Sequence, residues 1–369
     1  MRRLKTFDVI SDCNKAVQMG NITAHQSDNR LVELAEQNLN QLLTHVFKHT
    51  AVHKAVVVFD CASELASVLT QAYKRCLPDA QFVDFNQSSA DAVLAILADL
   101  MASDLVVLVQ STNFRLEAFR IRVELFKRGL KVIEHPHLSR MVGEEVAYYI
   151  DALAYDPAYF RGVGQQLKAA IDRAQNGCLI SGEGASEARL IFNSYFESAK
   201  LNVGDYSEMQ NIGGQFPIGE VFTEAQELSA VHGRVRIFAF GDTQYRVNRP
   251  SMPITLIVEG GQVVATENST PAFDVVLANI RADEQVVWLR EVGFGLNRAF
   301  TNNRSVSDIG SYERMCGVHL SLGAKHGIYG KPNFKRGDGK YHIDVFAVTD
   351  KVMLDTQVVY ENGAWTVGY

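Results

Sequence analysis

The sequence has few of the features that mark a secreted, membrane-bound or disulfide-stabilised protein. Its 369 residues include five widely spaced cysteines and no CxxC pair, so neither a disulfide framework nor a thiolate zinc site is predicted. No stretch approaches the roughly 18 uncharged apolar residues of a membrane-spanning helix. The basic start, Met1–Asp8, is followed by no apolar segment typical of a signal peptide. We therefore expect a cytoplasmic protein with no membrane partner.

Basic residues are too scattered for a nucleic-acid-binding surface. The chain has 36 Lys and Arg against 42 Asp and Glu, which gives a formal net charge of −6. A nucleic-acid-binding domain normally carries a basic stripe, so we expect no nucleic acid as a partner. The sequence also lacks the GxxxxGK[ST] phosphate loop and the GxSxG nucleophile elbow.

The first half of the chain alternates short apolar runs with helical segments. Strands are predicted at 55–59, 81–85, 105–109 and 131–134. Helical spacing predicts helices at 30–49, before Arg75, and at 89–102, 116–128, 144–153 and 157–174. Continuous β-branched runs between helices are typical of a parallel sheet that is covered on both faces. We therefore predict an N-terminal α/β domain with a parallel sheet over residues 1–176.

From Cys178 onward the strand-like runs are shorter and often alternate apolar with polar residues. The turn signals Glu259-Gly-Gly and Glu361-Asn-Gly separate such runs. This pattern favours an antiparallel or mixed sheet with a few helices. We predict a C-terminal α+β domain over residues 177–369, with the boundary near Asn176-Gly177.

The C-terminal half also holds the residues best suited to bind a metal. Three of the ten histidines, His319, His326 and His342, fall within 24 residues. On a strand, the spacing of His342 and Asp344 places both side chains on one face. An imidazole beside a carboxylate makes half of a divalent-metal site, although a surface His/Asp pair has the same spacing.

Two glutamates lie in unusually apolar surroundings. Glu220 stands in the segment FPIGEVFT and Glu291 in LREVGFGLN. Carboxylates are seldom placed among apolar residues unless they are paired or bind a metal, because their desolvation is costly. Either a metal ion or an arginine such as Arg290 would meet this need.

Taken in order, these segments resemble the aminopeptidase T family of metallopeptidases over about residues 178–369. The resemblance implies removal of N-terminal residues from small peptides by a metal-activated water, and a homodimer. It implies two divalent ions of the Zn, Co or Mn class, held by Glu220, Glu291, His319, His342 and Asp344. Glu291 would bridge the ions, and Glu313 lies near a further ligand position.

The chain departs from the family at one position in the His-rich segment. The family has a tyrosine seven residues after the histidine that matches His319, where this chain has His326, and Tyr329 follows ten residues along. We therefore predict catalytic roles for His326 and Tyr329 together with Glu291.

The same fold family includes 2,5-dihydroxypyridine dioxygenase, which gives an alternative prediction. One Fe(II) would then be held by Glu291, His342 and Asp344, and would open the ring of a small-molecule substrate. His319 or His326 would act on the substrate hydroxyl as acid or base. A relative that serves in binding or biosynthesis, without peptidase action, is the third alternative.

Overall fold

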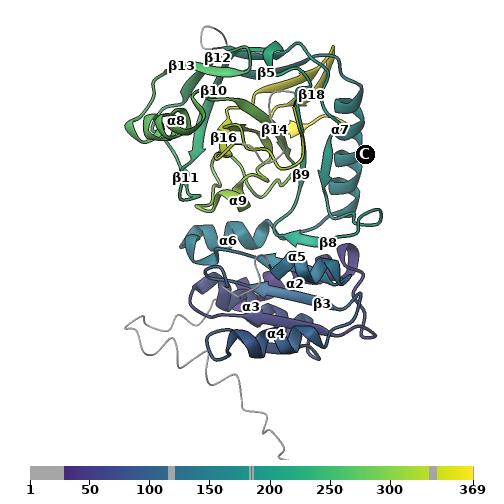
Figure 1. Ribbon diagram of the computed structural model, residues 1–369. Helices are drawn as coiled ribbons and strands as arrows, with labels where there is room; N and C mark the ends of the chain where they lie inside the picture. The colour runs from purple at the N-terminus through teal and green to yellow at the C-terminus, as the bar shows by residue number, and fades with distance from the viewer. Residues whose placement is uncertain (1–28, 115–120, 183, 185–186, 332–338, 369) are drawn as a thin grey trace, which may run out of the picture. The chain divides into compact units, whose positions relative to one another are not determined.

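The described part of the chain forms two compact units, each with its own sheet (Figure 1). The computed structural model describes residues 29–114, 121–182, 184, 187–331 and 339–368. The first unit runs to Tyr155 and also includes Tyr206–Phe216, and the second contains Asp156–Asp205 and the chain from Pro217 onward. Within the described residues, no helix is both long enough and apolar enough to cross a membrane.

The first unit contains a five-stranded parallel sheet of order β2-β1-β3-β4-β8. Its strands are β1 (Ala55–Phe59), β2 (Gln81–Asp84), β3 (Leu105–Val109), β4 (Lys131–His135) and β8 (Ile212–Gln215). The central strands β1 and β3 are buried along their whole length, as a sheet covered on both faces requires. The four strands predicted in the first half are confirmed, and β8 is an addition.

Helices flank this parallel sheet. They are α2 (Asn29–Gln41) with the π-helical turn η1 (Leu42–Val46), α3 (Glu64–Cys76), α4 (Ala90–Ala98), α5 (Ile121–Lys127), the 3₁₀ turn η2 (Leu138–Arg140) and α6 (Glu144–Asp151). Ser63 and Ser89 cap α3 and α4, because each side chain accepts a hydrogen bond from a backbone N–H of the first turn. The helix predicted at 116–128 is observed from Ile121; residues 116–120 of it lie outside the described residues.

The second unit is built on a 14-stranded antiparallel sheet. The main order is β19-β18-β17-β5-β6-β10-β16-β15-β14-β9-β7, and β11, β12 and β13 extend it from β10. Its strands are β5 (Gly177–Ser181), β6 (Ala188–Phe192), β7 (Lys200–Asn202), β9 (Glu220–Glu224), β10 (Val231–Gly241), β11 (Val247–Asn248), β12 (Ile254–Glu259), β13 (Gln262–Glu267), β14 (Leu289–Gly295), β15 (Gly317–Leu322), β16 (Ile343–Ala347), β17 (Lys351–Leu354), β18 (Gln357–Glu361) and β19 (Ala364–Trp365). Its helices are α7 (Pro157–Arg173), the 3₁₀ turn η4 (Leu228–Ala230), α8 (Pro271–Glu284) and α9 (Ile309–Tyr312).

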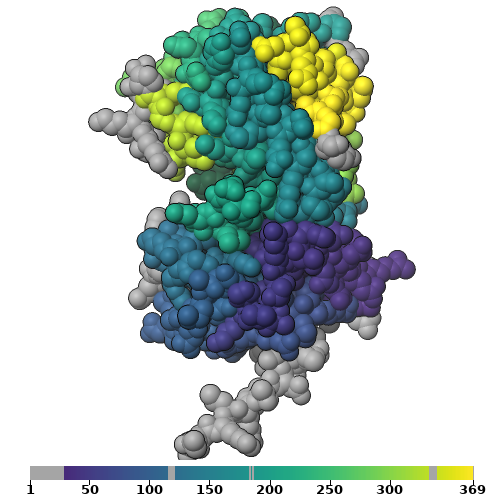
Figure 2. All heavy atoms as spheres, turned by 90° about the vertical axis from the view of Figure 1, so that its right-hand side faces the viewer, coloured from purple at the N-terminus to yellow at the C-terminus, as the bar shows by residue number. Residues whose placement is uncertain are grey.

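Segments far apart in the sequence meet in this sheet. The long strand β10 pairs with β6 at its start and with β16 further along, so it joins two parts of the sheet. Near the C-terminus, β17 pairs with β5, and Figure 2 shows the yellow C-terminal residues packed against teal residues of the same unit. The predicted fold class, an α/β domain with a parallel sheet followed by an α+β domain, is confirmed.

The predicted boundary at 176/177 differs from the division into compact units. Helix α7 belongs to the second unit, where it packs on β7 and β9. Residues 206–216 return to the first unit, because β8 pairs with β4. The sequence of β8, Ile212-Gly-Gly-Gln215, has no apolar run, so a prediction based on such runs assigns no strand there.

Candidate metal centre

Four neighbouring strands of the second unit carry the candidate ligands. In the sheet these strands follow one another in the order β16-β15-β14-β9. Residues paired on adjacent antiparallel strands project from the same face, so side chains from all four strands can converge. One ligand comes from each strand: Asp344, His319, Glu291 and Glu220. Residues 124 positions apart in the chain are thereby brought together.

Two glycines on β14 make room for this convergence. His319 is paired with Gly293, and a Cβ atom at Gly293 would lie 1.9 Å from Cε1 of that imidazole. A Cβ atom at Gly295 would lie 1.9 Å from the carbonyl oxygen of Met315. Both glycines share the strand face of Glu291, because side-chain direction repeats every second residue. The Glu-x-Gly-x-Gly pattern therefore places a carboxylate next to space for an imidazole.

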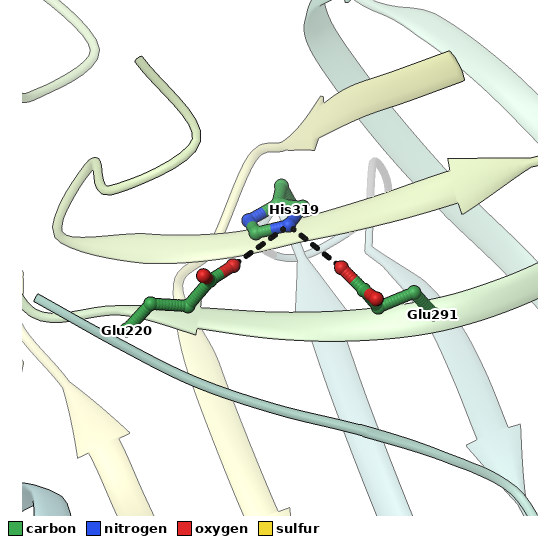
Figure 3. Close-up of side chains that lie close together, drawn as sticks. All are labelled: Glu220, Glu291 and His319. Carbon is green, nitrogen blue, oxygen red and sulfur yellow. Dashed lines mark ion pairs between the residues drawn. The ribbon is translucent and has the colours of Figure 1, made fainter. Parts of the chain in front are cut away.

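The imidazole of His319 lies between two carboxylates (Figure 3). Its Nε2 atom is 3.3 Å from Oε1 of Glu220 and 3.6 Å from Oε1 of Glu291. One ligand atom from each of these residues lies within 4.8 Å of the others. All three residues are buried, with at most 9% of their surface exposed. Buried oxygen and nitrogen atoms at this spacing can share one metal ion.

A second group of ligand atoms adjoins the first. Glu313, His319 and Asp344 also place one ligand atom each within 4.8 Å of one another. His319 is common to both groups, so they form one continuous centre. We call the five residues of the two groups, Glu220, Glu291, Glu313, His319 and Asp344, the carboxylate cluster.

Unpartnered buried atoms in the centre fit a divalent metal ion. Nε2 of His319 and Oδ1 of Asp344 are buried and satisfy no hydrogen-bond geometry. Buried polar atoms are nearly always bonded, because an unmet one costs about 1–3 kcal/mol. A cation would satisfy both atoms, and imidazole with carboxylates is a ligand set of Zn²⁺-type ions.

Arg314 is a further member of the site, and its sequence context does not reveal it. Its Nη1 atom donates to Oε2 of Glu220 at 2.8 Å and also contacts the carboxylate of Glu313. The arginine proposed from the sequence, Arg290, pairs instead with the buried carboxylate of Glu224. In the sequence, only its position next to Glu313 points to Arg314. Periodicity does not distinguish it from a surface arginine.

Acidic groups outnumber basic groups in and beside the carboxylate cluster. Its four carboxylates face one guanidinium, that of Arg314. Burial raises the pKa of Glu313 to about 8. Burial alone would lower the pKa of His319, but Glu291, Glu220 and Asp344 raise it to about 9. Glu313 and His319 must lose these protons before they can bind a cation, so metal binding at this site would be coupled to proton release.

The hydrogen-bond partners of His342 leave one of its ring nitrogens suited to ligation. Nδ1 lies 3.1 Å from the carbonyl oxygen of Lys325, and a carbonyl only accepts, so we assign the proton to Nδ1. Burial alone would lower the pKa of His342, but Asp344, whose Oδ1 lies 3.2 Å from Nε2, raises it to about 10, so a metal ion bound at Nε2 would displace a proton. The contact confirms that His342 and Asp344 lie on one face. A carbonyl that fixes the ring nitrogen opposite the ligating one is the usual arrangement around a metal.

His326 has the opposite arrangement. Its Nδ1 accepts a hydrogen bond from the backbone N–H of Ile328 at 3.2 Å. In the neutral ring the proton is then on Nε2, which lies 3.1 Å from Oε2 of Glu291. Burial alone would raise the pKa of Glu291, but His319 and His326 hold it below its usual value. His326 thus lies in contact with Glu291, and its catalytic role stays a prediction.

Three of the residues named from the sequence lie outside the carboxylate cluster: His326, Tyr329 and His342. Among the described residues, Glu291, His342 and Asp344 do not form a three-ligand group, whereas both groups that do form include His319. The hydroxyl of Tyr329 donates to the carbonyl oxygen of Ser198 at 2.7 Å. That hydrogen bond has to break before Tyr329 can reach a substrate, so its catalytic role stays a prediction.

Comparisons with known proteins agree with the fold. No family model and no curated protein matches the sequence. Among solved structures, wild-type AmpT from Thermus thermophilus is similar, with a TM-score of 0.55 and 11% sequence identity. The match covers 91% of this chain and 99% of that chain. At this identity the likeness concerns the fold alone, and the chain therefore has a distant aminopeptidase T-like fold.

Proposed function

We propose that this chain is a metal-dependent hydrolase that removes N-terminal residues from small peptides. One observation carries the proposal: Nε2 of His319 is buried, lacks a hydrogen-bond partner, and lies 3.3 and 3.6 Å from the carboxylates of Glu220 and Glu291. The AmpT-like fold is consistent with it.

The carboxylate cluster would hold the metal, with His342 as a further ligand beside Asp344. Two ions of the Zn, Co or Mn class are proposed, and when bound they would polarise a peptide carbonyl and activate a water molecule. Glu291 lies 3.6 Å from Nε2 of His319 and 3.1 Å from Nε2 of His326, and in this position it would be a ligand of the metal.

The remaining residues of the site would orient the metal ligands and transfer protons. The planar guanidinium of Arg314 binds one oxygen of Glu220 and one of Glu313. The second oxygen of each carboxylate would then be available to the metal. His326 carries a proton on Nε2 beside Glu291, which is the position of a general acid for the departing amine. The backbone N–H of Glu291 donates a hydrogen bond to Oγ of Ser321 at 3.0 Å, which holds the backbone of Glu291 in place.

Metal content and peptide hydrolysis test this proposal together. We expect two divalent ions per chain after reconstitution, and release of leucine from leucine p-nitroanilide. Glu291→Gln should abolish turnover while the far-ultraviolet circular dichroism stays unchanged. Glu259→Gln, an exposed glutamate at the end of β12, is the matched control and should remain active.

The alternative activity gives a different result in the same assays. One iron per chain, with oxygen consumed during ring cleavage of a dihydroxypyridine, would replace the hydrolase by a dioxygenase. Near-normal turnover of Glu291→Gln would also contradict the role proposed for this carboxylate.

A further inference from the structure

A cavity of about 650 Å³ borders the metal centre at His342. This volume is in the range of small-molecule sites, about 300–1,000 Å³. Its wall includes Tyr245 after β10, Asn279 of α8, and Lys325 after β15. His342 belongs to the wall, and its Nε2 atom lies 3.2 Å from Oδ1 of Asp344. A small molecule in this cavity would therefore reach the centre.

The charge of the cavity wall is opposite to that of the whole chain. The eight residues that line it include Lys325, Lys340 and His342 but no Asp or Glu. The ammonium of Lys340 is already paired with Asp283, at 2.7 Å. Lys325 is exposed, and among the described residues no carboxylate pairs with its ammonium. Lys325 thus offers the cavity a positive charge that is available to a ligand.

The carboxylate of Glu284 accepts three backbone hydrogen bonds and, among the described residues, forms no ion pair with Lys325. Its Oε2 accepts from the N–H of Ala324 at 2.6 Å, and its Oε1 accepts from the N–H groups of Lys340 and Tyr341 at 2.7 and 2.9 Å. These three hydrogen bonds also tie together the two chain segments that carry the lysines. The backbone of Lys325, whose N–H also donates to the carbonyl oxygen of Tyr341 at 3.0 Å, is thereby held at the wall.

We propose that Lys325 binds a carboxylate of the substrate. This inference rests on the proposed function, and it narrows the substrates to short peptides that carry a carboxylate within reach of the cavity. The carboxylate belongs either to the free C-terminus of a di- or tripeptide or to an acidic side chain. The neutral donors of Tyr245 and Asn279 on the same wall can bind the peptide without competing for that charge.

Paired substrates that differ only in the carboxylate test the proposal. Leucylglycine is compared with its C-terminal amide, and leucylglutamate amide with leucylglutamine amide. In Lys325→Gln the acid-to-amide ratio of kcat/KM should fall about three- to tenfold for the pair whose carboxylate binds there, as for loss of a partly exposed ion pair. The backbone carbonyl that holds His342 is kept in this variant. Lys54→Gln, an exposed lysine outside the cavity, should leave the ratio unchanged.

Unchanged ratios for both pairs in an active Lys325→Gln enzyme would overturn the proposal. If the wild-type protein hydrolyses no peptide, the proposed function fails and a binding assay decides the inference. Ligand-observed NMR with the metal-free full-length protein should then detect N-acetylleucylglycine but not its amide, and the signal should be lost in Lys325→Gln. Equal binding of the acid by both proteins, or none by the wild type, would refute the role of Lys325.

Discussion

Two fully buried histidines, one in each unit, have opposite environments. His135 ends β4 of the parallel sheet, and both of its ring nitrogens are bonded, to the hydroxyls of Tyr73 at 2.7 Å and Tyr149 at 2.8 Å. Burial lowers its pKa to about 3. His319 on β15 faces carboxylates instead, its Nε2 has no hydrogen-bond partner, and its pKa is raised to about 9.

The chain of hydrogen bonds around His135 is complete. Tyr149 donates its hydroxyl proton to the carbonyl oxygen of Phe216, so it accepts from Nδ1 of His135. Nε2 of His135 then accepts from the hydroxyl of Tyr73. A neutral imidazole satisfies every group, which is the signature of a structural histidine. Burial alone therefore does not mark a functional histidine; the chemistry of its partners does.

Replacing His319 should give the largest effect, because it removes a ligand shared by both groups of the carboxylate cluster. His319→Leu should weaken binding of Zn²⁺ about a hundred- to a thousandfold, one ligand's share of a typical zinc-binding free energy. Calorimetric titration with Zn²⁺ measures this. The metal-free variant should unfold no more easily than the wild type, and a wild-type affinity would show that His319 is not a ligand.

The same replacement in the first unit should affect stability and not metal binding. His135→Leu leaves the hydroxyls of Tyr73 and Tyr149 without their buried partner, which should cost about 2–4 kcal/mol of unfolding free energy. Urea unfolding followed by circular dichroism measures this. Both tryptophans, Trp288 and Trp365, lie in the second unit, so their fluorescence serves as the control. An unchanged unfolding curve would contradict a structural role.

Acid should weaken the first unit through His135. Its pKa is about 3 when folded and 6.5 in the reference state, so below pH 6.5 the unfolded chain binds a proton that the folded chain does not. Stability should therefore fall by about 2 kcal/mol between pH 7 and pH 5 from this group. His135→Gln should remove this component of the pH dependence. Identical slopes for the variant and the wild type would be inconsistent with a neutral buried imidazole.

The smallest effect concerns the space beside His319. Gly293→Ala would place a methyl group where the imidazole now lies, and the displaced ring should bind Zn²⁺ about tenfold more weakly. Gly310→Ala is the matched control, because its Cβ would make an ordinary contact at 3.6 Å with Asp308. Equal affinities for the two variants would mean that the ring position does not limit binding.

Much of the fold was readable from the sequence, and the reason is local. The apolar runs that became β1 and β3 are continuous because both faces of the parallel sheet are covered. The hairpin of β12 and β13 follows from Gly260 and Gly261, which both adopt positive φ. The sequence does not predict strand β8, because its residues form no apolar run. Its extended conformation depends on pairing with β4 in the tertiary structure.

The candidate site was only partly readable. Apolar surroundings pointed to Glu220 and Glu291, and the structure brings both to His319. Which of His319 and His342 lies next to Glu220 and Glu291 depends on the register of four strands. Spacing along the chain does not reveal that register. Arg314 was missed for the same reason, because its partner Glu220 is 94 residues away.

The central claim is that the carboxylate cluster binds a divalent metal ion. Anomalous scattering from crystals grown with Zn²⁺ tests it most directly. The account predicts a peak at about 2.0–2.2 Å from Nε2 of His319 and from carboxylate oxygens of Glu220 or Glu291. A crystal whose bound zinc lies at other histidines, with none beside His319, would contradict it.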